Sequence, residues 1–90
     1  MMKTVQFTVS GRVQGVGFRY ATREAAGNLG IAGWVRNRAD GKVEGVAQAS
    51  ESRIEQFVDW LRQGPRPARV DRVRVEPLEA QPLARFDIRV

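Results

Sequence analysis

The segment from Gly11 to Arg19, which reads GRVQGVGFR, has the residue types of an anion-binding site. Gly15 and Gly17 allow backbone angles that other residues resist, so that consecutive N–H groups can point toward one place. If a helix begins directly afterwards, its N-terminus adds positive potential there. Arg19 can then present a planar guanidinium to two oxygens of one phosphate group. The segment therefore predicts a phosphate cradle; the plainer alternative is a turn whose arginine is solvated or paired with a carboxylate.

A second segment, from Gly33 to Gly45, contains a side chain that can position a water molecule. Asn37 falls near the end of a predicted strand, just before Asp40-Gly41, and its carboxamide can both donate to and accept from water. Asparagine beside a turn also commonly bonds to nearby backbone groups. The residues alone leave both roles of Asn37 open.

Histidine and cysteine are absent from the 90 residues. Their absence removes the commonest general base, any thiolate nucleophile and the usual ligands of zinc. Catalysis would therefore depend on arginine, asparagine, carboxylates, backbone amides or the substrate itself. The composition therefore excludes a thiolate zinc site.

Composition places the chain among ordinary globular proteins, with 42% hydrophobic and 28% charged residues. This length fits one domain, from residue 1 to residue 90. The net charge of +5 favours anionic partners, whether nucleic acid, a membrane surface or a phosphorylated metabolite, without choosing among them. No apolar stretch has the length of a signal or a membrane span, so we expect a cytoplasmic protein that does not bind membranes.

The apolar pattern predicts the elements that would hold the two segments. Period-two alternation from Val5 predicts a strand to about Val13, and helical spacing follows from Phe18 to Leu29, where Gly30 would end the helix. Strands over 31–38 and 42–49 flank Asp40-Gly41, a strong hairpin signal, and should be antiparallel neighbours.

The second half of the chain repeats this alternation of helix and strand. Ser50 and Ser52 are candidate caps of a helix, Ser52 and Glu55 have capping-box spacing, and Gly64-Pro65 would end the helix. Period-two alternation then predicts strands around 73–75 and 86–90, with Phe86, Ile88 and Val90 on one face. The order predicts an α+β, ferredoxin-like sandwich (βαββαβ with a short fifth strand), whose two helices cover one face of a mostly antiparallel sheet.

Together the two segments resemble motifs of the acylphosphatase family. The first is similar to its signature Gly-x-Val-Gln-Gly-Val-x-Phe-Arg, read from Gly11 to Arg19, and the second to its Gly-Trp-Val-x-Asn with a following Asp-Gly, read from Gly33 to Gly41. Shorter similarities, such as Trp60-Leu61 before Gly64-Pro65, extend the resemblance over nearly the whole chain.

The resemblance implies an enzyme that hydrolyses small acyl phosphates to a carboxylate and inorganic phosphate on the fold predicted above. We expect it to be a monomer with no metal site and no cofactor. The resemblance assigns the water-positioning role to Asn37 and a supporting role to Thr22. It assigns binding of the phosphoryl group to the loop residues and the arginine that follows them: Gln14, Gly15, Val16, Gly17, Phe18 and Arg19.

Two other functions remain as alternatives. The same fold occurs in RNA-binding domains, but those stack bases on aromatic residues exposed on central strands. Here Phe7, Phe57 and Phe86 fall on core positions, so we expect no specific nucleic-acid partner; the arginines should form a solvated face, with Asp40 and Glu44 as turn and surface residues. The second alternative is a non-catalytic anion-binding module.

Overall fold

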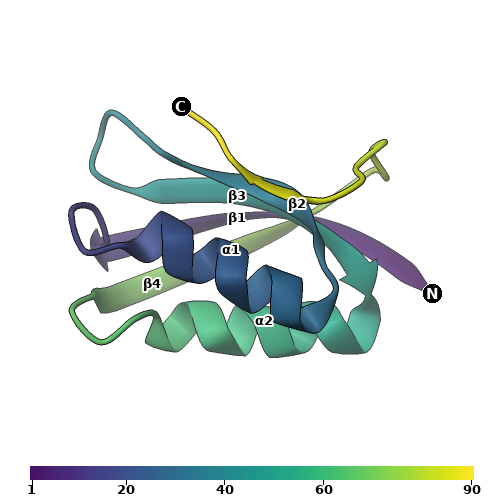
Figure 1. Ribbon diagram of the computed structural model, residues 1–90, viewed down its shortest axis with the longest axis horizontal. Coiled ribbons are helices and arrows are strands. Elements are labelled where there is room, and N and C mark those ends of the chain that lie inside the picture. Colours follow the sequence, from purple (N-terminus) through teal and green to yellow (C-terminus); the bar gives the residue numbers. More distant parts are fainter.

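In chain order the elements are β1 (Met2–Arg12), α1 (Phe18–Leu29), β2 (Ala32–Asn37), β3 (Val43–Ser50), α2 (Glu51–Gln63), β4 (Arg69–Leu78) and β5 (Phe86–Ile88). The strands form one five-stranded sheet with the order β4-β1-β3-β2-β5, so β3 is the central strand and β1 lies beside it. The computed structural model describes all 90 residues. All neighbouring strands are antiparallel except β2 and β5, which are parallel. Both helices pack on one face of the sheet (Figure 1).

This architecture confirms the predicted ferredoxin-like fold. The predicted helix over 18–29 is present with the same bounds, and Gly30 ends it in the left-handed conformation, with φ of 68°. β2 and β3 pair antiparallel across the predicted hairpin, with Asn37 opposite Val43. α2 ends where Gly64 begins, again as predicted.

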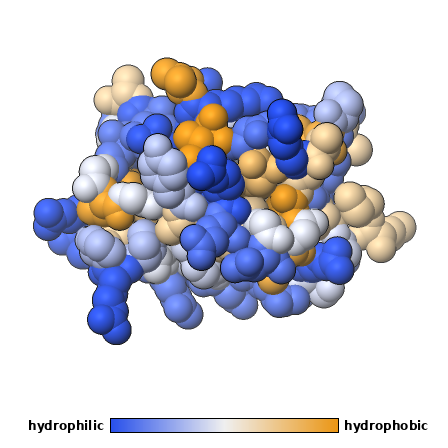
Figure 2. Space-filling model, in the orientation of Figure 1, coloured by the Kyte–Doolittle hydropathy of each residue, from blue (hydrophilic) through white to orange (hydrophobic).

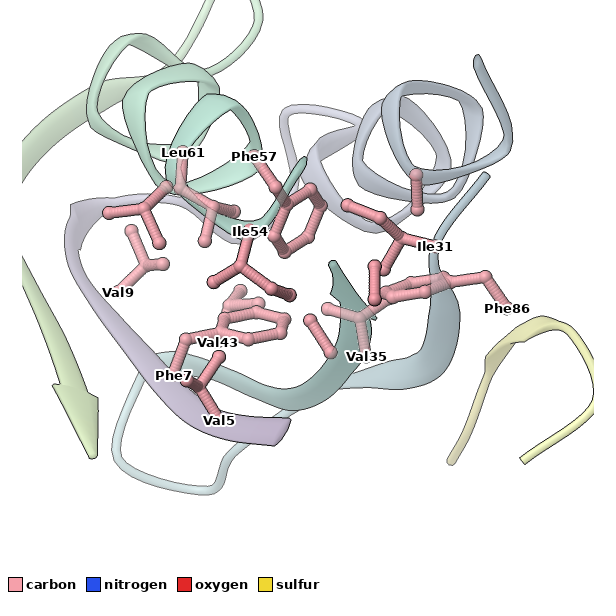
Figure 3. Close-up of a cluster of buried hydrophobic side chains, with 14 of the residues drawn as sticks. Val5, Phe7, Val9, Ile31, Val35, Val43, Ile54, Phe57, Leu61 and Phe86 are labelled. Carbon is pink, nitrogen blue, oxygen red and sulfur yellow. The ribbon is translucent and has the colours of Figure 1, made fainter. Parts of the chain in front are cut away.

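The hydrophobic core lies between the sheet and the two helices (Figure 3). Every second residue of β1 points into it, because side chains alternate between the faces of a strand. Phe7, Phe57 and Phe86 are all buried, as expected, and the ring of Phe57 contacts the other two with centroid distances of 5.4 and 5.9 Å. Hydrophobic residues on the face seen in Figure 2 form only small, separate groups among hydrophilic ones.

Of the two caps predicted for α2, Ser50 occupies the N-cap position, whereas the predicted capping box of Ser52 and Glu55 was wrong. The helix begins at Glu51, with Ser50 in the N-cap position, and no side chain caps it. β3 runs to Ser50, so the strand passes directly into the helix. Ser52 therefore lies inside the first turn, and the capping box with Glu55 does not form.

The last two strands are less buried than their alternation predicted. Val75 is 38% exposed, and Val90 lies beyond the end of β5 and is fully exposed. β4 is an edge strand, so its outer positions gain less cover from the helices than the central strands do. Its edge position also explains why it tolerates Pro77, which has no N–H to donate to a further strand.

The connection between β4 and β5 is fastened to the open face of the sheet by Gln48. The Gln48 amide donates to the backbone oxygen of Gln81 at 2.9 Å and accepts from the backbone N–H of Gln81 at 2.9 Å. The Thr4 hydroxyl donates to the same Gln48 oxygen at 2.6 Å. This buried glutamine satisfies its polar atoms far from the β2–β3 turn.

Candidate active site

The loop between β1 and α1 is held at both ends by buried side chains. Val13 precedes it and Phe18 follows it, and both belong to the core. Between them Gly15 and Gly17 adopt left-handed φ values of 74° and 76°. No other part of the chain lies within 4 Å of where a side chain would begin at either glycine, so the backbone is open to approach on those sides.

The backbone N–H groups of this loop are free. No N–H from Gly15 through Tyr20 donates a hydrogen bond within the chain, and the first bond of α1 runs from Ala21 to the oxygen of Gly17 at 3.0 Å. No side chain caps the helix, and no acidic residue lies in its first turn. Unpaired donors at a helix N-terminus attract an anion, because the helix dipole adds positive potential there.

Arg19 lies in the first turn of α1 beside these donors. Its side chain takes part in none of the ion pairs or side-chain hydrogen bonds of the chain, whereas Arg36, Arg38 and Arg62 each pair with a carboxylate. The alternative in which this arginine is neutralised by a carboxylate of the chain is therefore excluded. Its guanidinium is available to a ligand.

Asn37 is the last residue of β2 and carries an unsatisfied acceptor. Its Oδ1 is buried and has no hydrogen-bond partner. It follows Val35 by two residues, so it belongs to the face of the strand that carries the core. A buried acceptor without a partner costs about 1 to 3 kcal/mol, so Oδ1 has a strong tendency to bind a polar group supplied from outside the chain.

Gln14 links the loop to the hairpin that follows Asn37. Its Nε2 donates to the backbone oxygen of Arg38 at 2.7 Å and to that of Lys42 at 3.0 Å. The loop, the start of α1 and the β2–β3 turn lie at the same end of the molecule (Figure 1). The two segments singled out in the sequence are thus brought together, although 24 residues separate Gln14 from Arg38.

Thr22 and the side chain of Phe18 lie behind the loop, in the core. The buried Thr22 hydroxyl donates to the backbone oxygen of Phe18 at 2.7 Å, which ties the first turn of α1 together. The Phe18 ring packs against Trp60, with 5.8 Å between ring centroids. Phe18 therefore offers an anion only its backbone N–H.

Glu44 was wrongly expected to be a surface residue. It is buried, on the open face of the sheet, where its Oε2 accepts from Arg36 Nε at 2.7 Å, and the Arg38 guanidinium lies 3.7 Å from its Oε1. Asp40 pairs with Arg38 at 2.9 Å. The hairpin register, which places Arg36 opposite Glu44, is the signal that could have revealed this cluster.

The structure contains neither a cluster of metal ligands nor a membrane-spanning helix. No group of three or more histidine, cysteine, aspartate or glutamate residues is arranged to hold a metal ion. No helix has both the length and the apolar character needed to cross a bilayer.

The chain is a small α+β protein: a ferredoxin-like sandwich whose first loop presents free backbone donors beside an unpaired arginine. The family model described as Acylphosphatase matches residues 5–88. The chain is 51% identical over 81 residues to an acylphosphatase of Pseudomonas paraeruginosa, covering 90% of this chain and 89% of that one. This chain belongs to the acylphosphatase family.

Solved structures agree with this assignment. The crystal structure of acylphosphatase from Bacillus subtilis superposes with a TM-score of 0.95 and 36% identity over the whole of both chains. An acylphosphatase from Coxiella burnetii gives the same TM-score at 38% identity, over 98% of this chain and 93% of that one. The activity is hydrolysis of acyl phosphates, and nothing in these comparisons favours the nucleic-acid-binding or non-catalytic alternatives.

Proposed function

We propose that the loop amides and Arg19 bind the phosphoryl group of an acyl phosphate and that Asn37 positions the water that attacks it. The observation that carries this proposal is the buried, unpaired Oδ1 of Asn37, at the same end of the molecule as the free loop donors. Asn37 Oδ1 lacks a hydrogen-bond donor, and the loop N–H groups lack an anionic acceptor. A hydrated acyl phosphate supplies both.

The phosphoryl oxygens would accept from the backbone N–H groups of residues 14–18 and from the guanidinium of Arg19. Charge-assisted bonds of this kind are stronger than neutral ones, and an arginine can bind two oxygens at once. Donors fixed by the backbone need no reorganisation when charge develops on the phosphoryl oxygens, so they stabilise the transition state.

Asn37 Oδ1 would accept a hydrogen bond from the attacking water and aim its oxygen at phosphorus. As the new P–O bond forms, the P–O bond to the acyl group breaks and the carboxylate leaves with the electron pair. A phosphate oxygen takes the water's proton, so the products are a carboxylate and dihydrogen phosphate. A carboxylate is a good leaving group, so this route depends on positioning more than on a strong base.

Residues 1–90 act as one domain, a cytoplasmic monomer that needs neither a metal ion nor a cofactor and acts on small acyl phosphates. The absence of histidine and cysteine from the sequence supports the metal-free route, because these are the ligands that zinc prefers.

Phosphate release from benzoyl phosphate, measured with and without a chelator, tests this proposal. We expect equal rates in both conditions, competitive inhibition by inorganic phosphate, and severe loss of activity in Arg19→Ala. A rate abolished by the chelator and restored by a divalent cation would overturn the metal-free route. An active Arg19→Ala variant would overturn the assignment of the phosphoryl site.

A further inference from the structure

The side chain of Gln14 makes the only side-chain hydrogen bonds between the loop after β1 and the β2–β3 hairpin. Both hydrogens of its Nε2 are used, one on the Arg38 oxygen at 2.7 Å and one on the Lys42 oxygen at 3.0 Å. Because both partners are carbonyl oxygens, only the nitrogen of the amide can face them. The side chain is therefore directed at the hairpin and away from the anion that its backbone would help to bind.

The two carbonyl groups that accept from Gln14 belong to Arg38 and Lys42, the residues at the two ends of the β2–β3 turn. The Arg38 N–H donates to the Lys42 oxygen at 2.8 Å, which closes the turn directly after Asn37. Gln14 adds its two bonds across the same pair of residues. The position of the backbone one residue beyond Asn37 is thus fixed relative to the loop.

The loop has no other side-chain hydrogen bond to the hairpin, although Val16 packs against the hydrophobic core. Its backbone donors make no bond within the chain, and Gly15 has no neighbour within 4 Å of its would-be side chain. The buried anchors Val13 and Phe18 fix its two ends, but neither touches the hairpin through a hydrogen bond. Gln14 is the polar link between the two halves of the site.

We infer that Gln14 is a positioning residue, whose side chain sets the distance between the phosphoryl group held by the loop and the water held by Asn37. This inference rests on the proposed function, and it separates two roles of one residue. The backbone N–H of Gln14 belongs to the phosphoryl site, whereas its side chain acts through Asn37. Removing the side-chain amide should therefore lower turnover and leave phosphate binding intact.

The test is a double-mutant cycle between Gln14→Met and Asn37→Ala with benzoyl phosphate as substrate. Methionine keeps the length of the side chain and removes both donors. In the otherwise natural protein we expect kcat to fall about tenfold, since a misplacement of about 1 Å can cost that much or more. The inhibition constant of inorganic phosphate should change less than about twofold, because the backbone donors remain.

The decisive arm is Gln14→Met in the Asn37→Ala background. There we expect kcat to change less than about twofold, because the water has already lost its guide and the two sites are coupled. A full tenfold loss in that background, an unchanged kcat in Gln14→Met alone, or a phosphate affinity that falls with kcat would each overturn the inference. Normal turnover in Asn37→Ala alone would instead overturn the proposed function, so the two failures are distinguishable.

Gln48→Met is the matched control. Gln48 is also a glutamine that bridges distant segments, and it makes three hydrogen bonds, but it lies five residues along β3 from the hairpin end. We expect a lower melting temperature with kcat within about twofold of the natural protein. Gln14→Asn, which keeps an amide but is one methylene too short to reach both carbonyls, provides the same test if Gln14→Met does not fold; full activity in Gln14→Asn would overturn the inference.

Discussion

The two faces of the sheet differ sharply at the end of β2. On the open face, Arg36 and Arg38 pair with the buried carboxylate of Glu44, and Arg38 pairs also with Asp40. On the helix side, Arg19 has no carboxylate partner, and the buried Oδ1 of Asn37 has no donor. The charged groups on the open face are thus paired within the chain, whereas Arg19 and the acceptor of Asn37 are not.

This difference separates arginines that hold the fold from one that is available for chemistry. A buried carboxylate such as Glu44 needs paired charges to remain in place, and the two arginines supply them. The unpaired acceptor of Asn37 and the free loop donors raise the free energy of the folded protein. A ligand that pairs with them therefore stabilises it most. Changes on the open face should therefore alter stability, and changes on the helix side should alter rate.

The largest effect should come from Arg19→Lys. Lysine keeps the charge but cannot bind two phosphoryl oxygens with one planar group, so we expect kcat/KM to fall about 100-fold to 1000-fold. Steady-state hydrolysis of benzoyl phosphate measures this loss. Arg23→Lys, one turn further along α1, is the control and should be nearly neutral. If Arg19→Lys is nearly as active as the natural protein, Arg19 is not the arginine that binds the phosphoryl group, and the contrast with the paired arginines of the open face fails.

Asn37→Ala should lower kcat about 100-fold while inorganic phosphate still binds, because the water loses its guide and the loop donors remain. Inhibition by phosphate and the turnover rate are measured on the same preparation. Asn28→Ala, at an exposed position near the end of α1, should leave both values unchanged. If phosphate binding in Asn37→Ala is lost together with turnover, Asn37 has a different role from the one proposed.

Gly17→Ala should weaken phosphate binding about tenfold, because a left-handed residue with a side chain costs about 1 to 2 kcal/mol and distorts the loop. The matched control is Gly30→Ala, at the other end of the same helix, where φ is 68° instead of 76°. Both variants should lose about the same free energy of unfolding, but only Gly17→Ala should lose affinity for phosphate. Equal phosphate affinities would show that the loop geometry is not part of the site.

Glu44→Gln should have the smallest effect on rate. It removes the charge from a carboxylate whose side chain is 10% exposed, so we expect the free energy of unfolding to fall by about 1 kcal/mol, a modest value because Arg36 is itself 46% exposed. Turnover should stay within about twofold. Asp71→Asn, in an exposed pair with Arg69, should change neither quantity. A large loss of turnover in Glu44→Gln would place the open face within the site.

The parts of the structure that were predicted correctly are those with local causes. The bounds of α1 follow from a glycine at each end, and the hairpin follows from Asp40-Gly41 between two alternating segments. The position of the loop between a strand and a helix follows from the same signals. Agreement among them specified the fold, because each local preference fits the same arrangement.

The parts that were missed depend on what covers each residue from a distance. Alternation marks Val75 as apolar, but it does not reveal that β4 lies at the edge of the sheet. The burial of Glu44 depends on two arginines across the hairpin, and the hydrogen bonds of Gln14 join residues that only the fold brings together. The free acceptor of Asn37 likewise becomes visible only when all its neighbours are placed.

The donors that open toward the anion at the first loop belong to the main chain, and this limits how mutation can reach them. Exchanging the exposed side chain of Tyr20, for example, leaves the N–H of that residue in place. Only proline, which has no N–H, removes a donor directly. The sequence of this loop can therefore drift at positions whose side chains face away, provided that the glycines keep the peptide groups turned in the same direction.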